Sequence, residues 1–586
     1  MIKGLRFFIE FGWKCEKKYI IFLVLNQLIK CTIPLVATIM PRYIINELMY
    51  KQRLYVVFLY TMFLIGYTLL ANALGTVLSF KSFKYRCRVA AEFDVYIHKK
   101  MVEADYSNLE SAKYIEAKEK AAKFIFGDMH GFSYVLDLAV GMIGKMLTLL
   151  GVVAIIALLH PIFVLVFVGI AIINSIVEAR VRKKQVDMEL EMTSLERKWA
   201  YYGEIMENFQ YGKEIRINSL GKWLIEKERQ YAGIVNQKRE KSNNLGVKSN
   251  VTDSVLTFVQ QGISYTYIIY RVVEKSITIG DFSMYISGIL LFSDAMKNVI
   301  TSFIELLSYR GYYDAMEEYL NIPNTMYKEE GKSVKKCRHI IKFENVYFKY
   351  QGQNNYALKD INLEIKEGER IAIVGENGSG KTTFIKLLCR IYDPEEGRIT
   401  IDGMDIKNIR YEEYAKLFSV VFQDSKLYSF SLKENIILSQ DYCEKKWDTA
   451  IKEAGLKERI EKMPRGKETN IYRNFDDEGI EPSGGEAQKI ALARAIYKDA
   501  PFFVLDEPTA ALDPQAENEL YKRFGEITKN KTTFFVTHRL ESTKFCEKIL
   551  MFSDGEIVEY GTHSELMEIK GKYAKLYKLR EELYNN

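Results

Sequence analysis

Cysteine and proline are scarce in this chain, whose 586 residues include only seven cysteines and ten prolines. The cysteines are scattered, odd in number and form no Cys-x-x-Cys pair. This pattern argues against a disulfide framework and against a cysteine-based zinc site. We therefore expect the water-exposed parts of the chain to lie in a reducing compartment.

A large excess of charge of one sign is also missing, because 82 lysines and arginines accompany 76 acidic residues, which gives a net charge of +6. A nucleic-acid-binding protein usually carries a clustered basic face, and we therefore expect no nucleic acid partner. A small surplus of Lys and Arg is typical of the cytoplasmic loops of membrane proteins.

Long apolar runs are concentrated in the first 310 residues. A helix that crosses a membrane needs about 20 mostly apolar residues, and six segments meet this requirement: 19–40, 55–80, 134–159, 161–179, 251–273 and 282–307. Pro161 predicts a tight hairpin between the third and fourth segments. We therefore predict that residues 1–320 form an α-helical membrane domain of six transmembrane helices, in contact with the lipid bilayer.

Two long charged loops, residues 81–132 and 180–250, separate some of the predicted spans. Both are poor in proline and glycine, so they are compatible with helices that extend well beyond the bilayer. Lys and Arg beside the span ends indicate that these loops and both termini are cytoplasmic. Local changes of pattern at 107–117 and 210–218 predict turns that contact another domain, and the alternative is a pair of solvated arms without a partner.

Two features of the membrane region leave alternatives open. Residues 5–13 mix Leu, Phe and Trp with basic residues, which predicts either a short amphipathic helix in the membrane interface or the frayed start of the first span. Polar residues inside the spans either line a substrate path or, near span ends, extend to the interface. These residues are Gln27, Lys30, Asp137, Lys145, Asn174, Gln260, Gln261, Asp294 and Lys297.

The second part of the chain has a different pattern of apolar and polar residues. Residues 321–339 are polar and predict a linker. From residue 340 onward, short β-type runs alternate with helical segments, which predicts an α/β domain with a largely parallel sheet over residues 340–586. The chain is thus predicted to fuse a helical membrane domain to an α/β domain.

A glycine-rich motif follows the apolar strand predicted at 371–374 and precedes a predicted helix. It matches G-x-x-x-x-G-K-[ST], the phosphate loop of P-loop ATPases, whose backbone N–H groups surround phosphate oxygens. Lys381 would reach the β- and γ-phosphates of ATP, and the Thr382 hydroxyl would bind Mg²⁺. The predicted nucleotide-binding residues are Gly375, Asn377, Gly378, Ser379, Gly380, Lys381, Thr382 and Thr383.

A second apolar strand, residues 501–505, ends in two acids. Asp506 can hold Mg²⁺ through water, in the manner of a Walker B acid. Glu507 can accept a proton from an attacking water, and we predict that it is a catalytic residue. Two solvated acids after a strand are the alternative, which the phosphate-loop motif disfavours.

Residues 483–495, Ser-Gly-Gly-Glu-Ala-Gln-Lys-Ile-Ala-Leu-Ala-Arg-Ala, resemble the signature sequence of the ABC ATPases. The resemblance implies that Ser483, Gly484 and Gly485 grip the γ-phosphate of an ATP bound by the opposite subunit. Pro482 and Glu486 depart from the family, which usually has leucine and glutamine there. Since proline fixes its own φ and lacks an N–H, we expect an altered start of the signature helix.

The other motifs of that family surround the signature in the same order. The resemblance implies that Tyr350 stacks on adenine and that Gln423 is a catalytic residue that contacts Mg²⁺ and the membrane domain. It also implies that His538 is the catalytic switch histidine. Residues 511–513, Ala-Leu-Asp, are similar to the D-loop. Together with the predicted spans and Thr-Ile-Gly-Asp at 278–281, these motifs resemble the exporter branch of the ABC transporters.

The resemblance implies a homodimer in the cell membrane, with the ATPase domain in the cytoplasm. The few prolines and the abundant Lys, Ile and Asn indicate a bacterial source. The homodimer would export an amphipathic small molecule, a peptide or a lipid by alternating access coupled to ATP hydrolysis. An ATP-gated channel or regulatory membrane sensor with the same fold is the alternative, which Glu507 and His538 disfavour. An importer normally divides the membrane and nucleotide parts between chains, whereas they are fused here.

Overall fold

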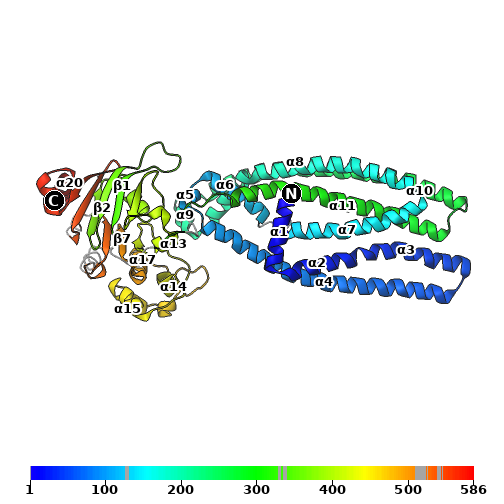
Figure 1. Ribbon diagram of the computed structural model, residues 1–586, viewed down its shortest axis with the longest axis horizontal. Helices are drawn as coiled ribbons and strands as arrows, with labels where there is room; N and C mark the ends of the chain where they lie inside the picture. Colours follow the sequence, from blue (N-terminus) through cyan, green and yellow to red (C-terminus); the bar gives the residue numbers. More distant parts are fainter. Residues whose placement is uncertain are drawn as a thin grey trace. The chain divides into compact units, whose positions relative to one another are not determined.

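The computed structural model describes residues 2–125, 131–326, 331–333, 339–508, 523, 525–537, 543 and 545–585. The chain forms two compact units. Unit 1 comprises Met1–Val102 and Ala112–Pro323, and unit 2 comprises Glu103–Ser111 and Asn324–Asn586. Unit 1 is helical and unit 2 contains the strands (Figure 1). Residues 103–111 pack in unit 2, although our sequence analysis assigned them to the membrane region.

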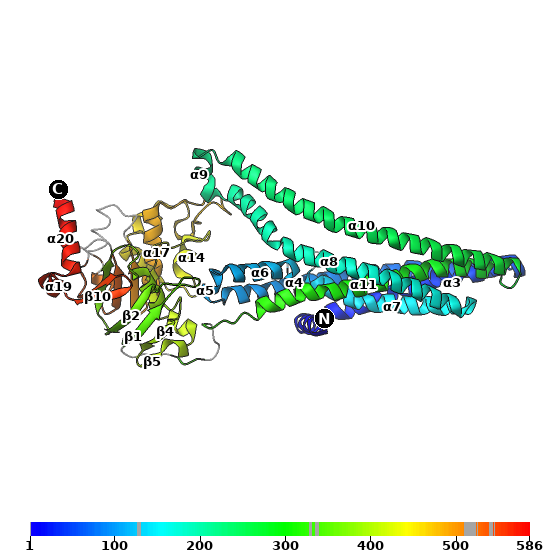
Figure 2. The ribbon, with the colours of Figure 1, turned by 90° about the horizontal axis from the view of Figure 1, so that it is seen from above.

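Long helices make up unit 1, and several of them run side by side (Figure 2). The pairs α8 with α10, α7 with α11, and α2 with α4 have extensive contacts. The helices are α1 (Ile2–Cys15), α2 (Lys17–Lys30), α3 (Thr32–Asn46), the π-helical turn η1 (Glu47–Lys51), α4 (Leu54–Val102), α6 (Ala112–Ile125), α7 (Phe132–Leu159), α8 (Pro161–Glu207), α9 (Gly212–Ile217), α10 (Gly221–Val273) and α11 (Ile279–Leu320).

Within the described residues, four helical stretches are long and apolar enough to cross a membrane: Lys17–Lys51, Leu54–Val102, Tyr134–Leu159 and Pro161–Glu207. The fifth and sixth predicted spans lie in α10 and α11, whose polar residues lower their mean hydropathy. A count of six transmembrane helices therefore stays a prediction. The predicted break between the third and fourth spans is confirmed, because α7 ends at Leu159 and α8 begins at Pro161.

The N-terminal helix α1 is separate from the first apolar span. Glu16, with φ −156° and ψ 93°, interrupts the helical backbone between α1 and α2. Phe8 is 2% exposed and its ring meets those of Phe93 and Tyr313 edge-on. The alternative that residues 5–13 are the frayed start of the first span is therefore wrong.

Polar side chains inside the predicted spans pair with one another within unit 1. Asp137 accepts a hydrogen bond from the Tyr19 hydroxyl at 2.7 Å and forms an ion pair with Arg86 at 2.9 Å. Such pairs satisfy polar groups that lipid cannot hydrate. Other such pairs include Lys30–Ser79, Lys145–Ser302, Gln260–Ser293, Asn174–Asp253, Lys297–Asp253 and Asn298–Asp294.

The Thr-Ile-Gly-Asp motif starts α11 and joins this helix to α3. Thr278 and Asp281 form a capping box, and Asp281 forms an ion pair with Arg42 of α3 at 2.6 Å. A side chain at Gly280 would lie 2.6 Å from the Arg42 carbonyl oxygen. The motif thus combines a helix cap, a close approach that only glycine allows, and an ion pair.

Unit 2 contains two sheets. A four-stranded antiparallel sheet has the order β2-β1-β4-β5, and a six-stranded sheet has the order β10-β9-β3-β8-β7-β6. Among the described strands of the second sheet, only β10 is antiparallel to its neighbour, which confirms the predicted largely parallel sheet. The strands are β1 (Ile341–Phe348), β2 (Leu358–Ile365), β3 (Arg370–Gly375), β4 (Glu396–Ile401), β5 (Met404–Asp405), β6 (Phe418–Val421), β7 (Phe502–Asp506), β8 (Thr532–Val536), β9 (Lys548–Ser553) and β10 (Glu556–Gly561).

Helices cover both faces of the six-stranded sheet. Successive residues of a strand point to opposite faces, and accordingly Phe502 and Val504 of β7 join one apolar core while Phe503 and Leu505 join the other. The first core includes α12 and the second includes α14, α15 and α17. The described helices are α5 (Tyr106–Leu109), α12 (Lys381–Leu388), α13 (Tyr411–Ala415), α14 (Leu432–Ile437), α15 (Glu444–Glu453), α16 (Lys457–Glu461), α17 (Gly484–Lys498), α19 (His563–Ile569) and α20 (Lys572–Asn585).

Candidate functional site

The predicted phosphate loop connects the buried strand β3 to the helix α12. Its glycines Gly375, Gly378 and Gly380 have φ of +153°, +78° and +107°, values that are open to glycine but rarely to other residues. A side chain at Gly375 would also meet the Ser379 hydroxyl oxygen at 2.7 Å. The loop geometry therefore depends on these glycines.

Two buried polar groups face the interior of this loop. The Lys381 side chain is 6% exposed, and its Nζ donates to the carbonyl oxygens of Gly375 at 3.1 Å and Glu376 at 2.8 Å. The buried Oγ of Ser379 has no hydrogen-bond partner within the described residues. A buried hydroxyl without a partner costs free energy, and a phosphate oxygen would accept a hydrogen bond from it. The residues present thus fit a nucleotide phosphate.

An acidic pair lies at the carboxyl end of β7. Asp506 is 1% exposed, and its Oδ1 has no hydrogen-bond partner in the described part of the chain. Burial, and then the neighbouring Glu507 carboxylate, raise the pKa of Asp506 to about 6. A divalent cation beside the carboxylate would offset both effects. The chemistry of this position therefore fits Mg²⁺.

Glu507 follows directly, with the left-handed backbone of φ +52° that is rare for residues other than glycine. Its carboxylate Oε2 accepts a hydrogen bond of 2.9 Å from Nε2 of Gln423. Strained backbone of this kind is often found at functional sites. Two predicted catalytic residues that are 84 positions apart in the sequence thus meet directly.

The order of the strands brings these groups together. Strands β3, β8, β7 and β6 are parallel neighbours, so their carboxyl ends lie at one edge of the sheet. The phosphate loop follows β3, Asp506 ends β7, and Gln423 lies two residues after β6. The predicted phosphate, metal and catalytic groups therefore share one edge.

Tyr350, the predicted adenine platform, lies beside the start of α12. Its hydroxyl and that of Thr383 are hydrogen-bonded at 3.0 Å. The ring of Tyr392 meets the Tyr350 ring edge-on, with the ring centres 5.5 Å apart. Sequence reasoning missed Tyr392, because a single tyrosine after a helix matches no motif.

The signature residues lie in another part of unit 2. Ser483 and Gly484 are exposed at the amino end of α17, which packs in the second core. The Ser483 hydroxyl and backbone bond to Glu486 and Ala487, not to the phosphate loop. Within one chain, the helix that these residues begin thus packs on the other face of the sheet from α12.

The signature helix begins with a regular cap, so the prediction that Pro482 alters its start is wrong. Ser483 and Glu486 form a complete capping box, in which each side chain accepts from the other residue's backbone N–H. Pro482 precedes the cap, where its missing N–H is not needed. Glu486 also forms an ion pair with Arg459 at 2.7 Å. The predicted switch histidine His538 and the D-loop residues 511–513 lie outside the described residues.

Comparisons with known proteins agree on one family. Residues 358–510 match the family model described as ABC transporter. The chain is 28% identical over 582 residues to the subtilin transport ATP-binding protein SpaT of Bacillus subtilis, which covers 97% of this chain and 92% of that protein. It is 35% identical over 342 residues to the ATP-dependent lipid A-core flippase of Legionella pneumophila subsp. pneumophila. This alignment covers 58% of this chain and 56% of that protein.

A solved structure shares the fold of the whole chain. It is described as the structure of a bacterial Atm1-family ABC exporter with ATP bound, and it matches 96% of this chain and 98% of that chain with a TM-score of 0.82. The two sequences are 19% identical, so this similarity concerns the fold alone. The fold is a helical membrane region with an α/β ATPase domain.

We predict that Glu486→Ala destabilises the start of the signature helix. The substitution removes one half of the capping box and the ion pair with Arg459, and a lost cap costs about 1 kcal/mol. We expect lower thermal stability of unit 2 and slower ATP hydrolysis, measured by calorimetry and phosphate release. Glu486→Gln, whose amide oxygen can still accept the bond, and Pro482→Leu, outside the helix, serve as controls with near-wild-type values. Equal stability of Glu486→Ala and wild type would contradict the role of the cap.

Proposed function

Since this chain belongs to the ABC transporters of the exporter type, with a membrane region and an ATPase domain fused in one polypeptide, we propose that Glu507 is the base of its ATP-hydrolysing site. The observation that carries this proposal is the hydrogen bond between Gln423 and Glu507, next to the buried Asp506 carboxylate. ATP hydrolysis coupled to export is the activity of the family, and these residues are the ones that would perform it.

The residues of the phosphate loop would hold ATP in the following way. Backbone N–H groups of residues 375–382 and the amino end of α12 surround the phosphates, while Lys381 supplies positive charge. Tyr350 provides an aromatic face for the base. Thr382, Gln423 and Asp506 would hold Mg²⁺, which neutralises charge on the phosphate oxygens when bound.

Glu507 is placed to act on the attacking water. A carboxylate within hydrogen-bond reach can orient the water and accept its proton, and the Gln423 amide fixes the position of that carboxylate. His538 is proposed as a second group that contacts the γ-phosphate. A channel or a sensor needs no such base, so this arrangement supports a transporter that hydrolyses ATP over the alternative.

Two copies of the chain form the working transporter in this proposal. The exposed Ser483 and Gly484 stand at the amino end of a 15-residue helix, where N–H groups and the helix dipole favour phosphate. The helix that they begin packs on the other face of the sheet from the phosphate-loop helix. We therefore propose that they bind the γ-phosphate of an ATP molecule held by the phosphate loop of the second chain. The homodimer is proposed to lie in a bacterial cell membrane, with the ATPase domains and the termini in the cytoplasm.

The cargo proposed here is a compound of the subtilin kind. The subtilin transport protein aligns with 97% of this chain, which includes the membrane region that selects a cargo. The alignment with the Legionella flippase covers 58% of the chain. The length of the alignment thus favours a subtilin-like cargo over lipid A-core.

We predict that Glu507→Gln binds MgATP with near-wild-type affinity but hydrolyses it about 10²–10⁴-fold more slowly, because glutamine can position water but cannot take its proton. Phosphate release and nucleotide binding by the purified protein test this prediction. Asp506→Asn is the control, since loss of the metal-holding charge should weaken the Mg²⁺ dependence itself. Near-wild-type turnover of Glu507→Gln would show that the base lies elsewhere.

We predict that Lys381→Ala chains lower the ATPase activity of wild-type chains when the two are co-expressed. If both sites of a dimer must work, equal amounts of the two chains leave about half of the activity per wild-type chain, from random pairing. The measurement is ATPase activity against the mixing ratio, with differently tagged wild-type chains as the control. Full activity per wild-type chain at every ratio would contradict the two-chain proposal.

We predict that subtilin stimulates the ATPase activity of the protein in lipid vesicles, whereas lipid A-core does not. Cargo binding should favour the conformation that hydrolyses ATP, since a ligand shifts an equilibrium only by its preference for one state. The measurement is the ATPase rate with each compound, with Glu507→Gln vesicles as the background. Stimulation by lipid A-core, with or without stimulation by subtilin, or by neither compound would contradict the proposed cargo.

A further inference from the structure

Helices α19 and α20 pack against β3, the strand that leads into the phosphate loop, and against its neighbour β9. Tyr573 of α20 is fully buried in this contact, in an apolar core with Ala372 and Val374 of β3 and with Ile549 and Met551 of β9. The alternate residues of β3 join the core that includes α12, and alternate residues of a strand point to opposite faces. Helix α20 therefore lies on the face of β3 opposite to the phosphate-loop helix.

The buried hydroxyl of Tyr573 connects two other side chains. It shares a hydrogen bond of 3.1 Å with the Thr543 hydroxyl and one of 2.8 Å with Nδ1 of His563. A phenolic hydroxyl donates one hydrogen bond and accepts others, so a single group can serve both contacts. Thr543 and Tyr573 are both fully buried, so bulk water does not compete for their bond. Burial also raises the pKa of Tyr573, so the hydroxyl keeps its proton at neutral pH.

Thr543 belongs to the connection between β8 and β9, which also carries the predicted switch histidine His538. The start of this connection is attached to β3, because the Thr537 N–H donates a hydrogen bond of 3.3 Å to the Ile373 carbonyl. The hydroxyl of Thr543 is attached to α20 through Tyr573. The connection is therefore attached to β3 on one side of His538 in the sequence and to α20 on the other side.

A carboxylate holds the start of α20 in place. Glu559 of β10 accepts hydrogen bonds from the backbone N–H groups of Lys572 and Tyr573, the latter at 3.0 Å. These N–H groups have no partner within the helix itself. A side chain at Gly571 would overlap the same carboxylate, and the Lys572 ammonium donates to the Ser553 hydroxyl at 2.7 Å. The backbone that carries Tyr573 is thus attached to β9 and β10, independently of its bond to Thr543.

We infer that Tyr573 is a positioning residue for ATP hydrolysis, which acts through Thr543 on the connection that carries His538. The inference rests on the proposed contact of His538 with the γ-phosphate. A connection attached on both sides of a residue restricts the positions open to that residue, and a small misplacement of a catalytic group lowers the rate of reaction. The phosphate loop binds the nucleotide independently of Tyr573. Loss of the Tyr573 hydroxyl should therefore lower kcat and leave the affinity for MgATP unchanged.

The bond is tested with Tyr573→Phe and Thr543→Val in the full-length protein, since both substitutions keep the size of the side chain and remove one hydroxyl. We expect each variant to lower kcat for ATP hydrolysis about 2- to 10-fold, the rate change that corresponds to one lost hydrogen bond. The KM for MgATP should stay within about 2-fold of wild type. The double variant should lose no more than either single variant, because both act on one bond. A wild-type kcat in either variant would overturn the inference.

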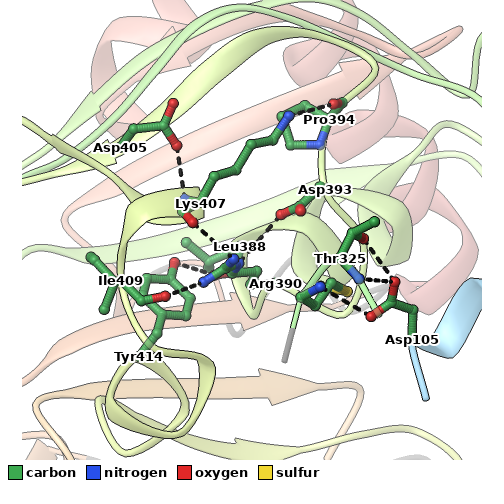
Figure 3. Close-up of polar contacts among 11 residues, drawn as sticks. Asp105, Thr325, Leu388, Arg390, Asp393, Pro394, Asp405, Lys407, Ile409 and Tyr414 are labelled. Carbon is green, nitrogen blue, oxygen red and sulfur yellow. Dashed lines mark hydrogen bonds and ion pairs between the residues drawn. The ribbon is translucent and has the colours of Figure 1, made fainter. Parts of the chain in front are cut away.

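Tyr414→Phe is the matched control. Tyr414 is also fully buried, and its hydroxyl donates a hydrogen bond of 2.7 Å to the Leu388 carbonyl, at the end of α12 that is remote from the phosphate loop (Figure 3). Its helix α13 carries none of the predicted catalytic residues. We expect Tyr414→Phe and Tyr573→Phe to lower the thermal stability similarly, whereas only Tyr573→Phe lowers kcat. An equal fall of kcat in both would show a merely structural role and would overturn the inference.

The dependence on His538 is tested by single-turnover ATP hydrolysis in His538→Ala. In that background Tyr573→Phe should cause no further loss of rate, because the residue that it positions is absent. The same fold-loss in both backgrounds would mean that Tyr573 acts on another group, and the inference would be wrong. Failure of the proposed site looks different. If His538→Ala alone hydrolyses ATP at the wild-type rate, the proposed role of His538 is wrong and the inference fails with it.

Discussion

The parallel order of β3, β8, β7 and β6 is the constraint on which the ATPase site depends. Parallel strands end at one edge of their sheet, so the phosphate loop, Asp506 with Glu507, and Gln423 meet there although they are far apart in the sequence. The same sheet separates α12 from α17 on its two faces. One arrangement thus gathers the proposed hydrolytic groups at one edge and keeps the signature helix on the other face from the phosphate-loop helix.

Local chemistry explains which parts of the site were predictable. The phosphate loop needs glycine at positive φ and a lysine at the start of a helix, and both requirements are visible in a short stretch of sequence. Gln423 lies in no comparable local sequence pattern, so it was identified only because the residues around it resemble a family motif. Tyr392 and Glu110 are 282 positions apart, and their contact follows from the tertiary fold alone.

In the membrane region, the sequence predicted where helices form, but it did not give the partners of their polar residues. The polar residues that lower the hydropathy of α10 and α11 pair with partners on neighbouring helices, for example Gln260 with Ser293 and Lys297 with Asp253. Hydropathy treats each residue alone and therefore overstates their cost. The expectation for Pro482 failed for a related reason. The effect of a proline depends on its place relative to the helix cap, which composition does not give.

The segment 103–111 shows how a domain boundary can differ from the order of the sequence. Continuity along the chain assigns it to the helices α4 and α6, but the hydrogen bonds of Asp105 and the bond of Glu110 to Tyr392 lie within unit 2. A helix as short as the four residues of α5 is not stable alone, so its structure depends on the surface that it contacts. The flanking helices are covalently joined to a segment ordered by the ATPase unit. A change at that surface must therefore either displace the segment or break its bonds.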